Sequence, residues 1–284
     1  MKKLIGFVDY YINEWHANHY VEWIKDAANR LGGDEYEVKY AWAELESDPM
    51  ENMSTDEWCE KFGVEKCESI AELCEKSDYI IVLAPSNPET HLRLAEPVLK
   101  YGKNTYIDKT FAPDYATAKR IFDIAGEHGT KFFSSSALRY APELESTKGA
   151  ASMTTTGGGS LFDEYIIHQA EMIVKSLGTD AKRVRTDSFD DGSKIAYVEF
   201  ASGREGKMMY APDNSFTVAA SFEDGRSFSE KVTDSEVFAK LMEDMLVFFE
   251  SGKVSFDTNE TLAVSAVREG AIKSYVQGGE WVEL

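Results

Sequence analysis

The feature that most constrains the fold is a regular alternation of strand-like and helical segments over the first 125 or so residues. Residues 79–84 (YIIVLA) form a continuous apolar run between Asp78 and Pro85. Such a run is typical of a strand buried on both faces of a parallel sheet. Strands that alternate with helices of about 10–15 residues predict βαβ units with right-handed crossovers. We therefore expect a doubly wound parallel sheet. The other expected strands are 3–8, 38–43, 104–107 and 131–134, and the expected helices are 18–31, 56–62, 70–76, 91–101 and 115–128.

The pattern changes in the second half of the chain. Residues 154–160 (TTTGGGS) are small, and we expect a flexible segment there. Short alternating strands with turn signals occupy residues 183–231. The remaining segments are helices at 166–177, 234–250 and 260–276 and a strand at 281–284. The sequence thus predicts an α/β protein with a Rossmann-type domain (1–125) and a C-terminal α+β domain (126–284).

The net charge of the chain limits the classes of partner that we expect. Acidic residues outnumber basic ones 50 to 30, which gives a formal net charge of −20. A surface of this charge repels phosphate backbones and anionic headgroups, so we expect neither nucleic acid nor membrane as a partner. No run of 18 apolar residues and no signal-peptide pattern is present, and we interpret Cys59, Cys67 and Cys74 as reduced thiols. These features predict a cytoplasmic protein.

Residues 78–128 carry motifs of a known family. They include Pro85, Asn87 and His91, then Gly102-Lys103, and then Asp108-Lys109-Thr110. This block resembles the Gfo/Idh/MocA oxidoreductases, and the likeness continues over 161–178 and the two later helices. The resemblance implies an NAD- or NADP-dependent dehydrogenase that transfers hydride between a secondary alcohol of a sugar or polyol and the nicotinamide.

The same resemblance implies a set of catalytic residues. The lysine matching Lys109 polarises the reacting oxygen or relays its proton, and the histidine matching His168 is the general base. Glu164 lies four residues before His168 and is the expected orienting acid, with Asp163 as the alternative. Each of these residues also has a structural interpretation. Lys109 would be a surface lysine paired with Asp108, His168 a structural histidine, and Glu164 or Asp163 part of a solvated acidic helix start.

Further positions are expected to bind ligands. Glu44 lies where an acid accepts the adenosine ribose hydroxyls, although its surroundings also fit an exposed acidic loop. Arg139 and Tyr140 are expected near the substrate, with a structural ion pair as the alternative for the arginine. The residues expected at the cofactor are Gly6, Tyr10, Tyr11, Glu44, Pro85, Ser86, Asn87, His91 and Asp108.

One stretch departs from the family. The glycines of G-x-G-x-x-G let backbone N–H groups approach a pyrophosphate, but residues 6–16 (GFVDYYINEWH) keep only Gly6. Asp9 and Glu14 place negative charge where phosphates would lie. This turn is either an unusual phosphate site or a lost one. Two alternative functions follow: a non-catalytic ligand-binding or regulatory protein, and a lyase or isomerase that uses bound dinucleotide transiently.

Two further features concern metal binding and the oligomeric state. His16 and His19 have HxxH spacing, but no third ligand is evident, and we expect no metal site. The sheet of the second domain mediates self-association in the family, which implies a homodimer or homotetramer.

Overall fold

The computed structural model describes residues 2–33, 36–47, 53–233 and 236–284. The chain divides into two compact units. The first contains the residues up to Ser134 together with Phe238–Ser255, and the second contains Ser135–Val237 and Phe256–Leu284.

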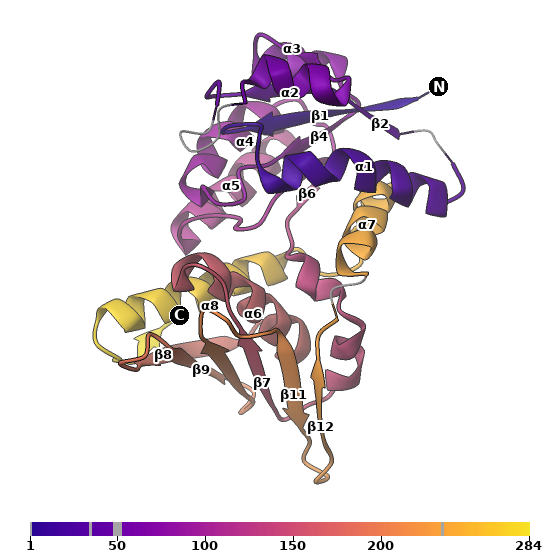
Figure 1. Ribbon diagram of the computed structural model, residues 1–284. Helices are drawn as coiled ribbons and strands as arrows, with labels where there is room; N and C mark the ends of the chain where they lie inside the picture. Colours follow the sequence, from indigo (N-terminus) through magenta and orange to yellow (C-terminus); the bar gives the residue numbers. More distant parts are fainter. Residues whose placement is uncertain (1, 34–35, 48–52, 234–235) are drawn as a thin grey trace. The chain divides into compact units, whose positions relative to one another are not determined.

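The first unit is built on a six-stranded sheet with the order β3-β2-β1-β4-β5-β6 (Figure 1). Every pairing in it is parallel. The strand order changes direction between β1 and β4, which makes the sheet doubly wound and confirms the expected fold class. Its strands are β1 (Lys3–Asp9), β2 (Tyr36–Ala43), β3 (Glu65–Lys66), β4 (Tyr79–Val82), β5 (Thr105–Ile107) and β6 (Phe132–Phe133).

Side-chain caps fix the starts of the helices in this unit. Ser54 forms a capping box with Glu57, and Ser69 and Asp114 accept hydrogen bonds from the backbone of the first turn that follows each of them. The helices are α1 (Trp15–Arg30), α2 (Thr55–Phe62), α3 (Ile70–Lys76), α4 (His91–Leu99) and α5 (Tyr115–His128), with a 3₁₀ turn η1 (Pro88–Thr90).

The expected domain boundary after residue 125 differs from the division in the structure. Helix α7 (Val237–Ser251) packs against the first sheet, and Figure 1 shows it beside α1. Phe249 stacks on Tyr79 of β4 with ring centroids 4.7 Å apart, and Phe248 packs edge-on against Phe133 of β6. Burial of these rings holds α7 in the first unit, although α7 comes late in the sequence.

The second unit contains a seven-stranded mixed sheet with the order β12-β11-β7-β10-β9-β8-β13. Two long helices, α6 (Phe162–Leu177) and α8 (Asn259–Val276), accompany it, with 3₁₀ turns η2 (Ala137–Tyr140) and η3 (Pro142–Thr147). The expected α+β character is confirmed. Its strands are β7 (Ser152–Gly157), β8 (Ala181–Ser188), β9 (Lys194–Phe200), β10 (Glu205–Tyr210), β11 (Thr217–Ser221), β12 (Ser227–Lys231) and β13 (Val282–Glu283).

The expectation of a flexible segment at 154–160 was wrong for residues 154–157. Residues Ser152–Gly157 form β7, which pairs parallel with β10 and antiparallel with β11. The side chains alternate, with Met153 and Thr155 buried. Thr155 donates to Gln169 of α6 at 2.9 Å, which ties the strand to the helix. β-Branched threonines suit such a half-buried strand.

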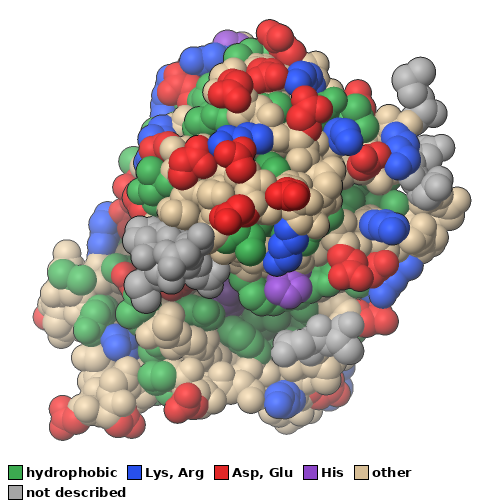
Figure 2. Space-filling view, turned by 45° about the horizontal axis from the view of Figure 1, so that its top comes forward, with side chains coloured by type: hydrophobic (Ala, Val, Ile, Leu, Met, Phe, Trp, Pro, Cys, Tyr) green, Lys and Arg blue, Asp and Glu red, His purple; other side chains and the backbone are tan. Residues whose placement is uncertain are grey.

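Acidic side chains are spread over the face shown in Figure 2, with lysines and arginines among them. This distribution agrees with the net charge of −20. Among the helices that the structure describes, none is long and apolar enough to cross a bilayer.

Candidate active site

The carboxyl ends of β1, β4 and β5 meet at one edge of the first sheet. Leu83 N donates to Val8 O, and Asp108 N donates to Val82 O, so the segments after these strands run side by side. Ligands of open α/β sheets bind in the crevice at this edge. Three groups of expected site residues lie here: those of the β1–α1 turn, those after β4, and Asp108 with Lys109.

Asp108 is the centre of a buried hydrogen-bond network. Its carboxylate meets Nδ1 of His16, and it accepts from the Lys109 backbone N–H at 2.8 Å. The phenols of Tyr20 and Tyr106 lie 3.4 and 3.3 Å from its Oδ1. The side chain is fully buried. Asp108, expected at the cofactor, is thus surrounded by groups of the chain itself.

The protonation of this network follows from its surroundings. Burial raises the pKa of Asp108, but attraction to His16, the hydrogen bond from it and the charge of Lys109 together outweigh burial and lower that pKa. Burial lowers the pKa of His16 more than Asp108 raises it. The contact with His16 therefore favours the ionised form of Asp108.

Lys109 follows directly after this network. It lies two residues beyond β5, and Thr110 N donates to Pro85 O at 3.4 Å, which joins its segment to the one after β4. The Lys109–Thr110 peptide bond is cis. The charge of Lys109 lowers the pKa values of both Asp108 and Glu14. Lys109 therefore lies at the carboxyl edge of the first sheet.

Glu14 caps the N-terminus of α1. Its carboxylate accepts from the backbone N–H of His16 at 2.7 Å and from that of Ala17. Burial raises the pKa of Glu14 to about 8 despite these two hydrogen bonds, and Asp108 adds to the rise. The helix end that would face a pyrophosphate thus carries a carboxyl group of the chain.

Asp9 ends β1 beside this cap. Its Oδ1 accepts from Tyr10 N at 2.7 Å, whereas the buried Oδ2 has no hydrogen-bond partner among the described residues. Burial and the neighbouring Glu14 carboxyl raise the pKa of Asp9 well above its ordinary value. Two acids whose protonated forms are favoured therefore share one end of the helix.

Gly6 lies inside β1, away from the turn. A Cβ at this position would come within 2.4 Å of Ser77 Oγ and 2.5 Å of a Leu73 methyl group. Close packing against the segment that contains α3 therefore explains the glycine.

Glu44 and two tyrosines lie beyond the β1–α1 turn. Glu44 forms a bidentate ion pair with Arg93 of α4, at 2.9 and 3.0 Å. The guanidinium of Arg93 also lies over the Tyr10 ring, 5.3 Å from its centre, and the Tyr10 and Tyr11 rings are 5.5 Å apart. An arginine thus joins the acid expected at the ribose.

The segment after β4 is held by backbone turns. Asn87 N donates to Ala84 O, and the Asn87 side chain donates to Glu89 at 3.1 Å. Pro85 and Ser86 complete the turn. His91 is buried, with ring nitrogens facing the carbonyl oxygens of Leu83 and Phe111. Burial lowers the pKa of His91, so its neutral ring donates to one carbonyl at a time, as a structural residue would.

His168 belongs to α6 of the second unit. Its Nδ1 is 2.7 Å from Ser136 Oγ, which also accepts from Leu138 N. The expected orienting acid Glu164 lies one helical turn earlier, on the same face as His168. Asp163 instead lines a pocket of about 360 Å³ with Lys194, Tyr210 and Tyr275, among others.

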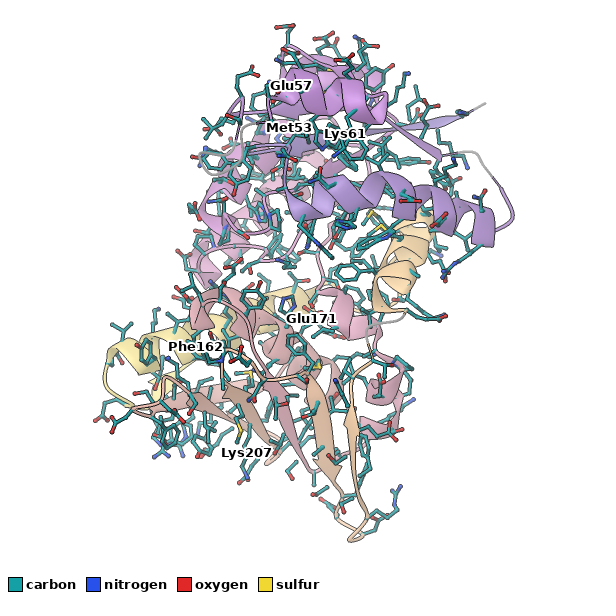
Figure 3. All side chains as sticks on the ribbon, in the orientation of Figure 1. Met53, Glu57, Lys61, Phe162, Glu171 and Lys207 are labelled. Carbon is teal, nitrogen blue, oxygen red and sulfur yellow. The ribbon has the colours of Figure 1, made fainter. Side chains whose placement is uncertain are left out.

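Arg139 is a structural residue of the second unit. It is buried and pairs with Glu171 at 2.5 Å and with Glu260 at 2.7 Å. Figure 3 labels Glu171 on α6. The guanidinium also lies 3.9 Å from the centre of the Phe256 ring. Of the two interpretations open for Arg139, the geometry favours the ion pair. Tyr140 follows it at the end of η2.

Sequence reasoning missed two residues. Ser136 bonds to His168, and Tyr20 is 3.1 Å from His16 Nδ1 as well as close to Asp108. Their only sequence signals are a serine before a short helix and a tyrosine one turn after His16. Within the described part of the chain, no group of three or more His, Cys, Asp or Glu residues is arranged to hold a metal ion.

The sequence and the fold resemble those of known proteins. Residues 43–136 match the family described as "Oxidoreductase family, NAD-binding Rossmann fold", GFO_IDH_MocA. The match begins after the β1–α1 turn. A comparison with curated proteins finds no match.

Several solved structures share the fold over nearly the whole chain. A myo-inositol dehydrogenase from Lactobacillus casei, in complex with NAD(H) and myo-inositol, has a TM-score of 0.79 at 11% identity and covers 100% of this chain and 97% of its own. A probable dehydrogenase from Thermotoga maritima has a TM-score of 0.77 at 14% identity, with 99% and 98% covered. A 3-ketoreductase from Actinomadura kijaniata, in complex with NADP and TDP-benzene, has a TM-score of 0.72 at 13% identity, with 96% and 98% covered.

The family match covers the block of residues in which the resemblance was strongest, and the solved structures extend the fold to both units. Residues 43–136 thus match the model of the Gfo/Idh/MocA family of NAD-binding oxidoreductases, and the chain as a whole shares the fold of the solved structures.

Proposed function

We propose that the chain is an NAD(P)-dependent oxidoreductase that transfers hydride between a secondary alcohol of a sugar or polyol and the nicotinamide. The observation that carries this proposal is the position of Lys109, which directly follows the buried Asp108–His16 pair at the carboxyl edge of the parallel sheet. A lysine with only a surface role would not need the buried Asp108–His16 pair directly before it. The myo-inositol and NAD(H) named for one solved structure and the NADP named for another support the substrate and cofactor classes.

The N-terminus of α1 has the chemistry that a phosphate requires. Two backbone N–H groups, those of His16 and Ala17, converge on one carboxylate, that of Glu14. A carboxylate there stands in for a phosphate oxygen, since both accept from free amides at the positive end of a helix. The helix end therefore fits the pyrophosphate once Glu14 gives up the two donors.

The chain's own residues would transfer the proton of the substrate's hydroxyl group. Bound NAD(P) supplies the hydride acceptor for alcohol oxidation. Lys109 would hold the substrate oxygen by its ammonium group, which donates a hydrogen bond to that oxygen and can relay its proton. His168 would take the hydroxyl proton at Nε2, provided that its Nδ1 proton is donated to Ser136.

A coupled assay tests the proposal. Purified protein is incubated with NAD or NADP and a panel of inositols, hexoses and sugar alcohols, and reduced nicotinamide is followed by absorbance. We expect turnover with one class of polyol, loss of turnover in Lys109→Met and His168→Asn, and full activity in Lys119→Met. Lys119 forms an exposed ion pair with Asp123 and serves as the matched control. Unchanged activity in Lys109→Met would remove the lysine from the mechanism.

Glu14 favours a second candidate, a ligand-binding or regulatory protein without catalysis. Its carboxylate already holds the two helix donors that a dinucleotide would use. Polyol binding in calorimetry, together with no dinucleotide binding and no turnover, would establish that function instead.

A further inference from the structure

The N-terminus of α1 is occupied by the chain itself. The Glu14 carboxylate accepts from both His16 N and Ala17 N, so its two oxygens use two of the first-turn donors. In helices of this fold, these donors are the groups that a bound anion takes. A ligand phosphate and Glu14 cannot use the same N–H groups at the same time.

A second observation points to a ligand at the same place. Asp9 Oδ2 is buried next to this cap and has no hydrogen-bond partner among the residues described. A buried acceptor of this kind is costly unless it is protonated or receives a donor. A ribose hydroxyl of a nucleotide meets either need, because it donates to an ionised carboxylate and accepts from a protonated one.

We infer that Glu14 is an internal competitor for the dinucleotide's pyrophosphate, and that the cofactor binds only when the Glu14 side chain leaves the N-terminus of α1. This inference rests on the proposed function, in which NAD(P) is the cofactor. It explains how a chain without the glycine-rich turn retains a helix end suited to an anion. It also makes cofactor affinity depend on one side chain that does not itself touch the reacting atoms.

The charges around Glu14 strengthen the competition. The ionised Asp108 repels an incoming phosphate, whereas Lys109 attracts it. When Glu14 is ionised, it adds a second negative charge at the same place. The raised pKa of Glu14 is consistent with this crowding, because burial and Asp108 both disfavour its ionised form.

The expected effect is measurable. Replacing Glu14 frees the two N–H groups that its side chain occupies, and where Glu14 is ionised it also removes a like charge near the ligand. We expect NADH or NADPH to bind Glu14→Ala about tenfold more tightly than the wild-type chain, a difference of about 1.4 kcal/mol. Glu14→Gln keeps an oxygen that accepts from the amides but removes the charge, so its affinity should lie between the two.

The experiment is a titration of four proteins with NADH, NADPH and inorganic pyrophosphate. Energy transfer from tryptophan to the nicotinamide reports the dinucleotides, and calorimetry reports pyrophosphate. The proteins are the wild-type chain, Glu14→Ala, Glu14→Gln and Asp114→Ala. Asp114 caps α5 in the same unit, so its variant loses a helix cap without changing the α1 terminus.

The outcomes separate the inference from the proposed function. Tighter dinucleotide binding in Glu14→Ala, with no change in Asp114→Ala, supports both. Tighter pyrophosphate binding in Glu14→Ala, without dinucleotide binding in any variant, keeps the competition and removes the proposed cofactor. Equal affinities of wild type and Glu14→Ala for all three ligands overturn the inference, and measurable NADH or NADPH binding in that case leaves the proposed function standing.

Discussion

His16 and Asp108 form a buried pair across the edge of the first sheet, although 92 residues separate them in the chain. The pair joins the first turn of α1 to the end of β5. It places an ionised carboxylate directly before Lys109 and closes that edge with the Tyr20 and Tyr106 phenols. The arrangement fixes the backbone from which Lys109 projects.

Removing His16 should therefore destabilise the first unit. His16→Ala leaves the buried Asp108 carboxylate without its partner, and breaking a buried pair of this kind costs about 3 kcal/mol or more. Urea unfolding measures the loss. His19→Ala, on the same helix, removes a ring hydrogen-bonded only to the local carbonyl of Trp15 among the described groups, and should cost less than about 1 kcal/mol. Equal losses in the two variants would contradict the role given to the pair.

Glu14 makes the free energy of unfolding depend on pH. The folded-state pKa of Glu14 is about 8, above the ordinary value of 4.5, so between these values the folded state holds a proton that the unfolded state releases. Its contribution to stability is therefore lost as the pH rises toward 8. Glu14 interacts with His16, Ala17 and Tyr20 of its own helix and, from neighbouring elements, with Asp9, Asp108 and Lys109.

A comparison with Glu14→Gln isolates this group, because the other groups are common to both proteins. We expect the variant's free energy of unfolding, relative to wild type, to rise by about 1 kcal/mol or more between about pH 5 and pH 8. Urea titrations at several pH values measure the difference. A difference that stays constant over this range would show that Glu14 titrates normally in the folded state.

Arg139 should affect stability rather than substrate binding. Arg139→Met leaves Glu171 buried without its cation and releases Glu260, and the expected loss is about 3 kcal/mol. Arg226→Met is the matched control, since Arg226 pairs with Asp224 on the surface and should change the unfolding free energy by less than about 0.5 kcal/mol. A raised KM with unchanged stability in Arg139→Met would instead make it a substrate residue.

The sequence predicts local structure where local chemistry determines it. The bounds of α3 and α5 agree with those expected, because Ser69 and Asp114 cap their first turns and Gly129 ends α5. Strand β7 was missed because its partner β10 lies about 50 residues further along the chain. Small residues such as those of residues 154–160 carry no local sign of that pairing.

The candidate site, like the fold, could be predicted from the sequence only in part. The order of strands and helices places Lys109 at the carboxyl edge of the sheet, since every parallel strand ends there. The letters of residues 9–16 do not reveal that His16 turns toward Asp108, or that Glu14 turns back onto its own helix. Those contacts depend on which side chains meet after the sheet has formed.

Ser136 should act as a positioning residue for His168. If the neutral ring donates from Nδ1 to Ser136 Oγ, Nε2 is left unprotonated and able to accept a proton. Ser136→Ala removes this acceptor, and we expect kcat to fall about tenfold with KM little changed, the loss of about one hydrogen bond.

The pH profile distinguishes this role from a general loss of structure. Ser136→Ala should shift the acid limb of the kcat profile, because the hydrogen bond to Nδ1 helps set the pKa of the His168 ring. Ser136→Thr keeps the hydroxyl group and should restore both the rate and the limb. Ser135→Ala is the neighbouring control, since Ser135 Oγ donates to the Ser136 carbonyl, and it should leave the acid limb in place. An unshifted limb in Ser136→Ala would mean that another group, Glu164 first, orients His168.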